Sequence, residues 1–403
     1  MSNKVYLDHS ATTKTDEDVA KLMLEYMTEN YGNPSSIHSF GRNARKAVEE
    51  AREKIARNIG AEPTEIIFTS GGTEADNLAI RGTAYANKKR GNHIITSTIE
   101  HHAVLDTYKS LEREGFQVTY LPVDEYGMVR LEDVKNAITD QTILISVMHA
   151  NNEVGTIQPI KEIGAIAKEK GIYLHSDTVQ SIGKIPVDVN ELNLDLLSIS
   201  AHKFYGPKGI GALYMRKGVR MLPTTYGGSQ ERKRRPGTLN VPGIVGFAMA
   251  LEKSVQSIPE QTAYQSRLRD KLIKSLMDKI GYVKLNGHPT DRLPNNVNLS
   301  FQFIEGESLL LSLDMKGVAA SSGSACTSGS LDPSHVLLAM GLTHEIAHGS
   351  LRLTLGKDNT EEQIDYVIDV LPEIVERLRA MSPLWADKIK ADDHQKKECC
   401  SNV

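Results

Sequence analysis

The chain has 403 residues, which is enough for about two or three domains with a large buried core. Its 47 lysines and arginines nearly balance 51 aspartates and glutamates, so the formal net charge is -4. Proteins that bind nucleic acid generally carry a basic excess or a basic stripe. The composition therefore argues against nucleic acid as a partner.

The three cysteines, Cys326, Cys399 and Cys400, are too few for a disulfide framework and are typical of a reducing compartment. Residues 1–10 lack the basic and apolar regions of a signal peptide. No apolar run approaches the roughly 18 residues that a transmembrane helix needs. We expect a soluble, cytoplasmic protein without a membrane partner, and we interpret Cys399 and Cys400 as solvated thiols rather than sulfur acceptors or metal ligands.

Helical and strand-like segments alternate over residues 15–258. An amphipathic helix is predicted over 42–60, where Ala44, Val48 and Ala51 share one face, and further helices are predicted over 74–89 and 160–171. Several strand-like runs are apolar nearly throughout, as parallel strands covered on both faces tend to be. The seven runs span 65–70, 93–101, 117–123, 142–150, 172–177, 196–201 and 210–216. This pattern predicts an α/β fold with a mostly parallel sheet of about seven strands.

The pattern changes after residue 258. An amphipathic helix is predicted over 261–280 and strands over 282–287 and 295–303, followed by a terminal helix with a capping box of Thr360 and Gln363. We assign residues 15–258 to a large domain, residues 1–14 with 259–382 to a smaller α+β domain, and residues 383–403 to a polar tail anchored by Trp385.

A candidate anion-binding turn lies in "IIFTSGGTEADNLAI", where a strand leads through glycines into a helix. Backbone N–H groups at Gly72 and Thr73 are placed to face an anion at the start of that helix. The pattern matches neither common phosphate-loop motif. Taken alone, a strand-turn-helix joint without a ligand is an equally good interpretation.

Two further residues follow the ends of predicted strands. Asp177 ends the strand over 172–177, where ligands bind in open parallel sheets, although such an aspartate more often caps a helix. Lys203 follows the next strand, and a lysine at the edge of a core is rarely kept unless it is paired or used chemically. Desolvation there lowers the pKa of an amine, as a Schiff-base lysine requires. The turn, the carboxylate and the lysine together indicate pyridoxal 5'-phosphate as the cofactor.

An aromatic side chain is expected to cover the cofactor ring. His101 and His102 lie where the segment over 93–101 turns into a helix, so one imidazole can stack on the ring and transfer protons. A pair of surface histidines is the simpler alternative for these residues considered alone.

Motifs along nearly the whole chain resemble the cysteine desulfurases of the nitrogen-fixation and iron–sulfur-cluster type. They include "YLDHSATT", "FTSGGTEADN", "EHHAV", "NNEVGTIQPI", "HSDTVQSIGK", "SISAHKFYGPKGIG", "SSGSACTSGS" and "GSLRLTLG", in that order. The resemblance implies a class V enzyme of the aspartate-aminotransferase fold, fold type I of the pyridoxal-phosphate enzymes. It implies a homodimer that converts L-cysteine to L-alanine and passes the sulfur to an iron–sulfur scaffold protein.

The same resemblance implies a role for each matching residue. Lys203 would form the Schiff base, Asp177 would pair with the pyridine nitrogen, and Gln180 would donate to the phenolate oxygen. His101 would stack on the ring and act in catalysis. Further cofactor contacts would come from Gly72, Thr73, Asn152, Ser200, His202 and, across the dimer, Thr238.

On the substrate side, the resemblance implies that Asn152 lines the site and that Arg352 holds the carboxylate of L-cysteine, because a guanidinium pairs two carboxylate oxygens at once. Cys326 would attack the substrate sulfur as a thiolate and carry it as a persulfide. Its glycine- and serine-rich segment, 321–330, resembles the branch with an extended loop, so we expect a mobile loop. No intrinsic metal is predicted, and only a transient iron–sulfur cluster would bind Cys326.

Other functions fit parts of the sequence less well. "HEIAH", residues 344–348, matches a zinc-protease motif, but Gly349 and a strand-like run follow at once. A class V aminotransferase has no use for a mobile cysteine, and an inactive scaffold-binding homologue would typically lack Lys203 or Cys326. A selenocysteine lyase would use the same pocket and stays open.

Overall fold

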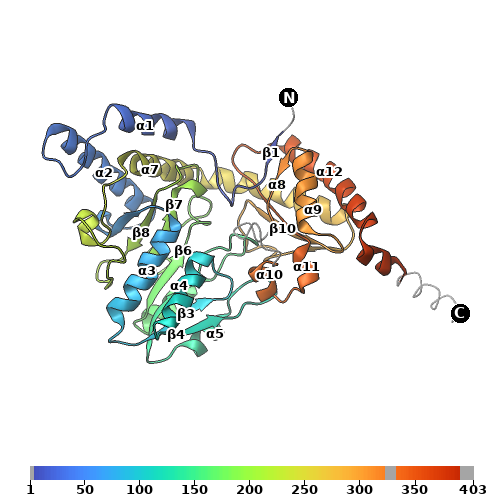
Figure 1. Ribbon diagram of the computed structural model, residues 1–403, viewed down its shortest axis with the longest axis horizontal. Coiled ribbons are helices and arrows are strands. Elements are labelled where there is room, and N and C mark those ends of the chain that lie inside the picture. The colour runs from blue at the N-terminus through green and yellow to red at the C-terminus, as the bar shows by residue number, and fades with distance from the viewer. Residues whose placement is uncertain (1–3, 323–332, 391–403) are drawn as a thin grey trace.

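The computed structural model describes residues 4–322 and 333–390 (Figure 1). Its main feature is a seven-stranded sheet in the order β2-β8-β7-β6-β5-β3-β4. Strand β8 is antiparallel to both neighbours, and all other pairs are parallel. The strands are β2 (Ile66–Thr69), β3 (His93–Ser97), β4 (Gln117–Leu121), β5 (Thr142–Ser146), β6 (Tyr173–Asp177), β7 (Leu196–Ser200) and β8 (Gly211–Met215). The predicted α/β fold class and all seven strand regions are confirmed.

Helices cover both faces of this sheet, which explains why the strands are so apolar. Along β7, Leu197 and Ile199 pack into the core beneath α2, α6 and α7, whereas Leu196 faces the core beneath α3 and α4. The helices of this part are α1 (Glu17–Thr28), α2 (Ser39–Asn58), α3 (Gly72–Asn87), α4 (His102–Arg113), α5 (Leu131–Ala137), α6 (Ile160–Glu169) and α7 (Val241–Gln256). Gly60 ends the helix predicted over 42–60 with a φ of 71°.

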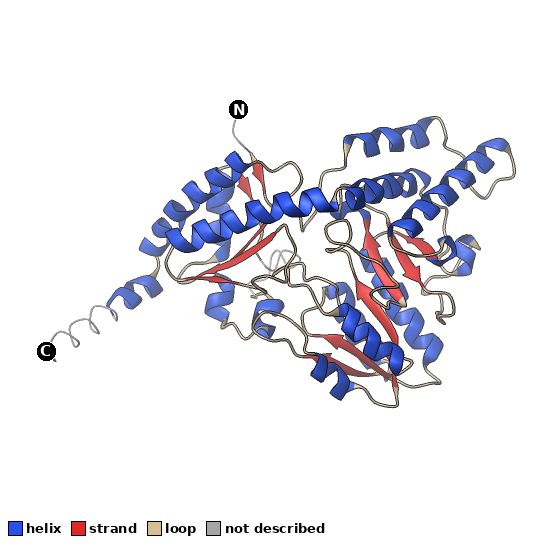
Figure 2. Cartoon of the chain, turned by 180° about the vertical axis from the view of Figure 1, so that it is seen from behind, coloured by secondary structure: helices blue, strands red, loops and turns tan. Residues whose placement is uncertain are grey.

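A smaller part is built on a separate antiparallel sheet, β12-β10-β9, and on the parallel pair of β1 and β11. Figure 2 shows the long helix α8 running from the large sheet to this part. The elements of the smaller part are β1 (Val5–Tyr6), α8 (Ile258–Lys279), β9 (Val283–Leu285), β10 (Asn296–Phe301), α9 (Gly306–Met315), β11 (Val318–Ala319), α10 (His335–Ala339), α11 (His344–His348), β12 (Ser350–Thr354) and α12 (Glu361–Ala380).

The capping box predicted from Thr360 and Gln363 is present at the start of α12. Beyond α12, residues 383–390 form one more helix rather than a loose segment. Trp385 lies with its ring 5.5 Å from Tyr282 and 5.4 Å from Phe303 between centroids, so it anchors this helix to the small part.

Helix α11 carries the "HEIAH" motif but ends at His348, whose successor Gly349 is the C-cap. Among the described residues, no group of three histidine, cysteine, aspartate or glutamate side chains is arranged to hold a metal ion. Within residues 4–322 and 333–390, none of the helices combines the length and apolar character needed to cross a membrane.

Candidate active site

Asp177 and Lys203 follow neighbouring parallel strands at the same edge of the large sheet. Asp177 is the last residue of β6, and Lys203 ends the 3-10 turn η2 (Ala201–Lys203), which follows β7 directly. Because parallel strands end at a common edge, the sheet brings the two side chains together at the place where open α/β sheets bind ligands.

The ammonium of Lys203 is held by the N-terminal segment. Its Nζ donates to the backbone oxygens of Ser10 at 2.5 Å and Ala11 at 2.8 Å. These carbonyls come from the segment between β1 and α1, some 190 residues away in the sequence. The segment therefore closes one side of the site around the lysine.

Asp177 is buried, with 6% of its surface exposed. Its Oδ1 accepts a hydrogen bond from the backbone N–H of Val179 at 2.8 Å, which is the contact of an Asx turn, and no helix lies in the described segment between β6 and β7 for it to cap. Burial raises the pKa of Asp177 to about 6, although the Val179 N–H and the charge of Lys203 act in the opposite direction. A cationic partner at its second oxygen would stabilise the ionised form, as a protonated pyridine nitrogen would.

Gln180 joins this arrangement through its side-chain amide. Its Nε2 donates to the Ser10 oxygen at 3.0 Å, and its Oε1 accepts from Lys184 Nζ at 3.1 Å. The Ser10 carbonyl is thus shared by Gln180 and Lys203, and it ties the two predicted cofactor residues to one backbone atom.

His101 is the N-cap of α4, and its Nδ1 accepts from the backbone N–H of Ala103 at 3.1 Å. Burial, with the charge of Lys203, lowers the pKa of His101 to about 4. The ring is therefore neutral near pH 7, and because Nδ1 is an acceptor, the proton resides on Nε2.

The residues of the predicted phosphate cup lie where α3 begins beside β7. A Cβ on Gly72 would lie 2.9 Å from Val179 Cγ2, and one on Gly71 would lie 3.8 Å from Ser200 Oγ. Glycine at position 72 therefore lets the start of α3 approach Val179, whereas the distance to Ser200 is an ordinary contact. His202 is fixed beside them by a 3.0 Å bond between its Nδ1 and Thr12 Oγ1, and burial lowers its pKa to about 4. Thr73 is exposed at the same helix end.

Arg352 enters from β12 of the small part and is 2% exposed. Its Nη1 donates to the backbone oxygen of Asn152 at 3.1 Å, and its Nη2 pairs with Asp8 Oδ1 at 2.9 Å. Among the described residues, its buried Nε has no hydrogen-bond partner. The guanidinium is therefore oriented but retains donors for a carboxylate.

Two predicted site residues are not placed with the others. Thr238 is exposed between the 3-10 turn η3 (Gln230–Lys233) and α7. Cys326 lies outside the described residues, as do Cys399 and Cys400.

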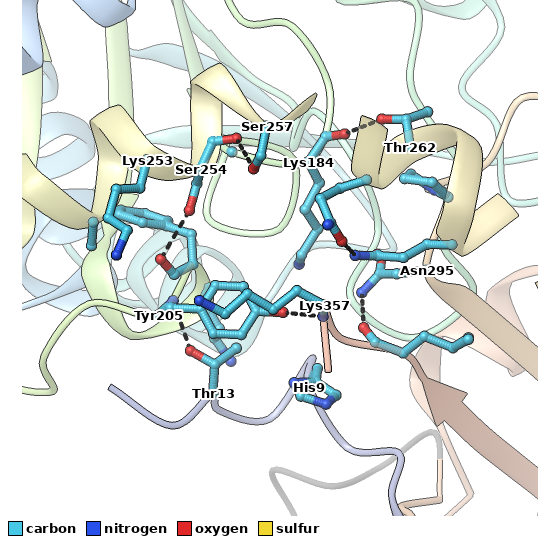
Figure 3. Close-up of a pocket in the computed structure, with 18 of the residues that line it drawn as sticks. His9, Thr13, Lys184, Tyr205, Lys253, Ser254, Ser257, Thr262, Asn295 and Lys357 are labelled. Carbon is cyan, nitrogen blue, oxygen red and sulfur yellow. Dashed lines mark hydrogen bonds between the residues drawn. The ribbon is translucent and has the colours of Figure 1, made fainter. Parts of the chain in front are cut away.

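A cavity of about 170 Å³ lies between the large and small parts, on the side of Lys203 bounded by α7 and α8 (Figure 3). Its lining includes five basic side chains and one buried carboxylate, which are His9, Lys184, Lys203, Lys253, Lys357 and Asp16. Lys253 and Lys357 both donate to Asp16, at 2.7 Å and 2.6 Å.

Several residues that contact the predicted site residues were not predicted from the sequence. Asp8 and Ser10 lie in "YLDHSATT" and Lys184 in "HSDTVQSIGK", so the motifs contained them without indicating their partners. Asp76 was also missed: it is buried in α3, and burial with the neighbouring Asp177 charge raises its pKa well above the usual range.

The model of the aminotransferase class-V family matches residues 5–367. The chain belongs to this family. It is 60% identical over 393 residues to a protein of Clostridium botulinum (strain Hall) named cysteine desulfurase IscS, which covers 97% of this chain and 99% of that protein. A Methanosarcina thermophila protein of the same name is 61% identical over 380 residues, with 94% of each chain covered.

Solved structures agree with this assignment. A NifS-like protein superimposes with a TM-score of 0.88 at 44% identity, covering 93% of this chain and all of that one. A structure described as SspA in complex with cysteine has a TM-score of 0.78 at 38% identity, over 87% of this chain and 98% of that chain. This protein is thus a cysteine desulfurase of fold type I, and the family uses pyridoxal phosphate.

The residues present fit that cofactor. The glycine turn at the start of α3 presents backbone N–H groups of the kind that bind a phosphate, the buried Asp177 carboxylate offers an oxygen to a protonated ring nitrogen, and Lys203 is the adjacent amine. An anion site, a buried acid and a lysine at one sheet edge match the three chemical ends of pyridoxal phosphate.

Proposed function

We propose that this protein takes the sulfur of L-cysteine onto Cys326 and releases L-alanine, with the site residues acting as the sequence predicts. The observation that carries the proposal is the meeting of Lys203 and Asp177 at one sheet edge, with Arg352 approaching from the small part. The sheet edge and the small part then supply an amine, an acid and a guanidinium suited to binding a carboxylate.

When bound, pyridoxal phosphate supplies an electron sink that labilises the bonds at Cα of an amino acid. Gly72, Thr73, Ser200 and His202 would bind its phosphate, and Asn152 would line its substrate side. Lys203 would hold its aldehyde, and the neutral amine of Lys203 would take the Cα proton. The neutral His101 would stack on the ring, with Nε2–H available for proton transfer.

Sulfur transfer requires the Cys326 thiolate. The thiolate attacks the substrate sulfur, an S–S bond forms as the Cβ–Sγ bond breaks, and the electron pair of that bond remains with the carbon. Protonation of Cβ, together with return of a proton to Cα, gives L-alanine. Arg352 would hold the substrate carboxylate throughout, with the donors that Asp8 and Asn152 leave free.

The two-domain division supports this chemistry. We propose that residues 15–258 bind the cofactor and that residues 1–14 with 259–382 carry Arg352 and the cysteine loop. Separate hydrophobic cores support the division: one includes Ile199 and Phe247 of the large part, and the other includes Val5 and Leu351 of the small part.

An exposed apolar surface supports the homodimer. Five of its members lie on α1, at the start of α2 and in the segment between these helices (Figure 1), and the sixth lies in the loop that follows β8; all are between 51% and 89% exposed. They are Leu24, Met27, Tyr31, Ile37, Phe40 and Tyr226. Neighbouring exposed apolar side chains are typical of protein–protein contacts, and in the proposed homodimer the exposed Thr238 would contact the cofactor phosphate of the partner subunit. Ile37→Asp with Tyr226→Asp should give a monomer in light scattering that retains less cofactor.

The sulfur acceptor we propose is an iron–sulfur scaffold protein, and the compartment is the cytoplasm, where the thiol stays reduced. The persulfide on Cys326 can be formed from L-cysteine that carries labelled sulfur and then mixed with a purified scaffold protein. We expect the label to move to the scaffold, and retention of the label on Cys326 would contradict this partner.

Incubation of the protein with L-cysteine tests the reaction. We expect equal amounts of L-alanine and persulfide in a single turnover, with a mass increase of about 32 Da on the Cys326 peptide. Cys326→Ser should retain cofactor and lose the modification. Alanine formation without modified Cys326 would overturn the sulfur-transfer step.

A further inference from the structure

Lys184 is a desolvated lysine on the wall of the cavity in Figure 3, four residues after Gln180. Among the described residues it forms no ion pair with a carboxylate. Its Nζ donates instead to the Gln180 backbone oxygen at 3.0 Å and to Gln180 Oε1 at 3.1 Å. Burial and the charges of Lys203 and Arg352 lower its pKa to about 7. A lysine beside two other cations is unfavourable for folding and is typical of a residue kept for function.

The turn that carries Lys184 is fixed by its backbone. Gly183 has a φ of 74°, and a Cβ there would lie 3.0 Å from Ser254 Cβ, so glycine suits this position. Lys184 N–H donates to the Ser181 oxygen at 3.0 Å, and Thr262 of α8 donates to the Lys184 oxygen at 3.1 Å (Figure 3). The side chain therefore starts from a defined point and reaches back to Gln180.

The partners of Gln180 determine which way its amide faces. Lys184 Nζ donates to Oε1 as well as to the Gln180 backbone oxygen, so the amide oxygen is the atom that faces Lys184. A carbonyl only accepts, so the atom beside the Ser10 oxygen must be Nε2, at 3.0 Å. Ser10 uses one of the two Nε2 hydrogens, and the other stays available to a further acceptor.

We propose that Lys184 is a positioning residue for the cofactor: by holding Gln180 Oε1, it presents Nε2–H to the phenolate oxygen of pyridoxal phosphate. The inference rests on the proposed role of Gln180. Without Lys184 the amide is free to turn, and Oε1 would then face a negatively charged oxygen. A donor to the phenolate favours its ionised form, so losing the donor raises the pKa of the bound chromophore.

The test is a pH titration of the visible absorbance of the cofactor-loaded enzyme. Lys184→Met keeps the length of the side chain and removes the donors, and we expect the chromophore pKa to rise by about one unit. Lys184→Arg keeps charge and donors and should restore the value. Lys253→Met is the matched control, because Lys253 lines the same cavity but pairs with Asp16, and it should leave the absorbance titration unchanged.

A double-variant comparison separates positioning from charge. If Lys184 acts through Gln180, then adding Lys184→Met to Gln180→Ala causes no further shift. The same shift in both backgrounds would show a through-space charge effect and overturn the inference. No shift with Lys184→Met, while Gln180→Ala shifts the pKa, would also overturn it. If Gln180→Ala itself causes no shift, the proposed role of Gln180 fails and the inference fails with it.

Circular dichroism of each cofactor-loaded variant identifies any variant that misfolds. If Lys184→Met misfolds, the test rests on Lys184→Arg, which should keep the chromophore pKa of the unaltered protein.

Discussion

Asp8 and Arg352 form an ion pair across 344 positions of sequence, with Asp8 Oδ1 2.9 Å from Arg352 Nη2. The segment that carries Asp8 also supplies the Ser10 and Ala11 carbonyls to Lys203. The same N-terminal segment therefore contacts both Lys203 and Arg352.

Asp8→Asn should weaken substrate binding. The variant keeps a hydrogen-bond acceptor but loses the charge that orients the guanidinium, so we expect KM for L-cysteine to rise about tenfold, about 1.4 kcal/mol, with little change in kcat. Steady-state kinetics measure this change. Asp358→Asn, which breaks the exposed pair with Lys14, is the control and should leave KM unchanged. An unchanged KM in Asp8→Asn would mean that Asn152 alone orients Arg352.

Lys203→Ala should abolish covalent attachment of the cofactor. Borohydride reduction followed by mass spectrometry should find pyridoxal phosphate on the Lys203 peptide of the unaltered protein and on no peptide of the variant. Lys208→Ala is a matched control. Among the described residues, Lys208 Nζ donates a hydrogen bond to the Thr13 backbone oxygen and to no other atom. Label on another lysine of the unaltered protein would contradict the assignment.

Asp177→Asn should retain cofactor but slow removal of the Cα proton. An amide cannot stabilise a protonated ring nitrogen as a carboxylate does, so we expect kcat to fall at least about a hundredfold. Exchange of the alanine Cα hydrogen with deuterated water, followed by NMR, measures this step directly. Exchange at the original rate would rule out the pairing with the ring.

Acid should destabilise the fold between about pH 6.5 and 4. Burial lowers the pKa of His149 to about 4, below its unfolded value, so in this window the unfolded chain binds the additional proton. The contribution of His149 is fully present above pH 6.5 and is lost on acidification at up to about 1.4 kcal/mol per pH unit. His149→Gln should flatten this dependence in urea unfolding, whereas exposed His344→Gln should not.

Breaking the Arg52–Glu231 pair should destabilise the large part. Both side chains are buried, and the guanidinium donates to both Glu231 oxygens, at 2.9 Å and 2.7 Å. Arg52→Met leaves the carboxylate buried without its cation, so we expect a loss of about 3–5 kcal/mol in urea unfolding. Lys46→Met breaks an exposed pair with Glu50 and should cost less than about 0.5 kcal/mol.

Local patterns were sufficient for most of the fold. Hydrophobic runs and the residues beside them predicted the seven strands, the Thr360 capping box, and Asp177 and Lys203 at strand ends. These features depend on residues that are close in sequence. The direction of β8 could not be predicted in this way, since a strand buried on both faces has the same apolar pattern whether it runs parallel or antiparallel.

The sequence by itself determined that Lys203, Asp177 and Gln180 follow strands in one α/β sheet, and that the motifs are those of a cysteine desulfurase. Only the tertiary structure decided what supports them. The Ser10 carbonyl meets Lys203 and Gln180, Asp8 meets Arg352, and Lys184 sets the direction of the Gln180 amide. The physical reason is that hydrogen bonds and ion pairs depend on distance in space, whereas hydrophobic periodicity reports only which face of an element is buried.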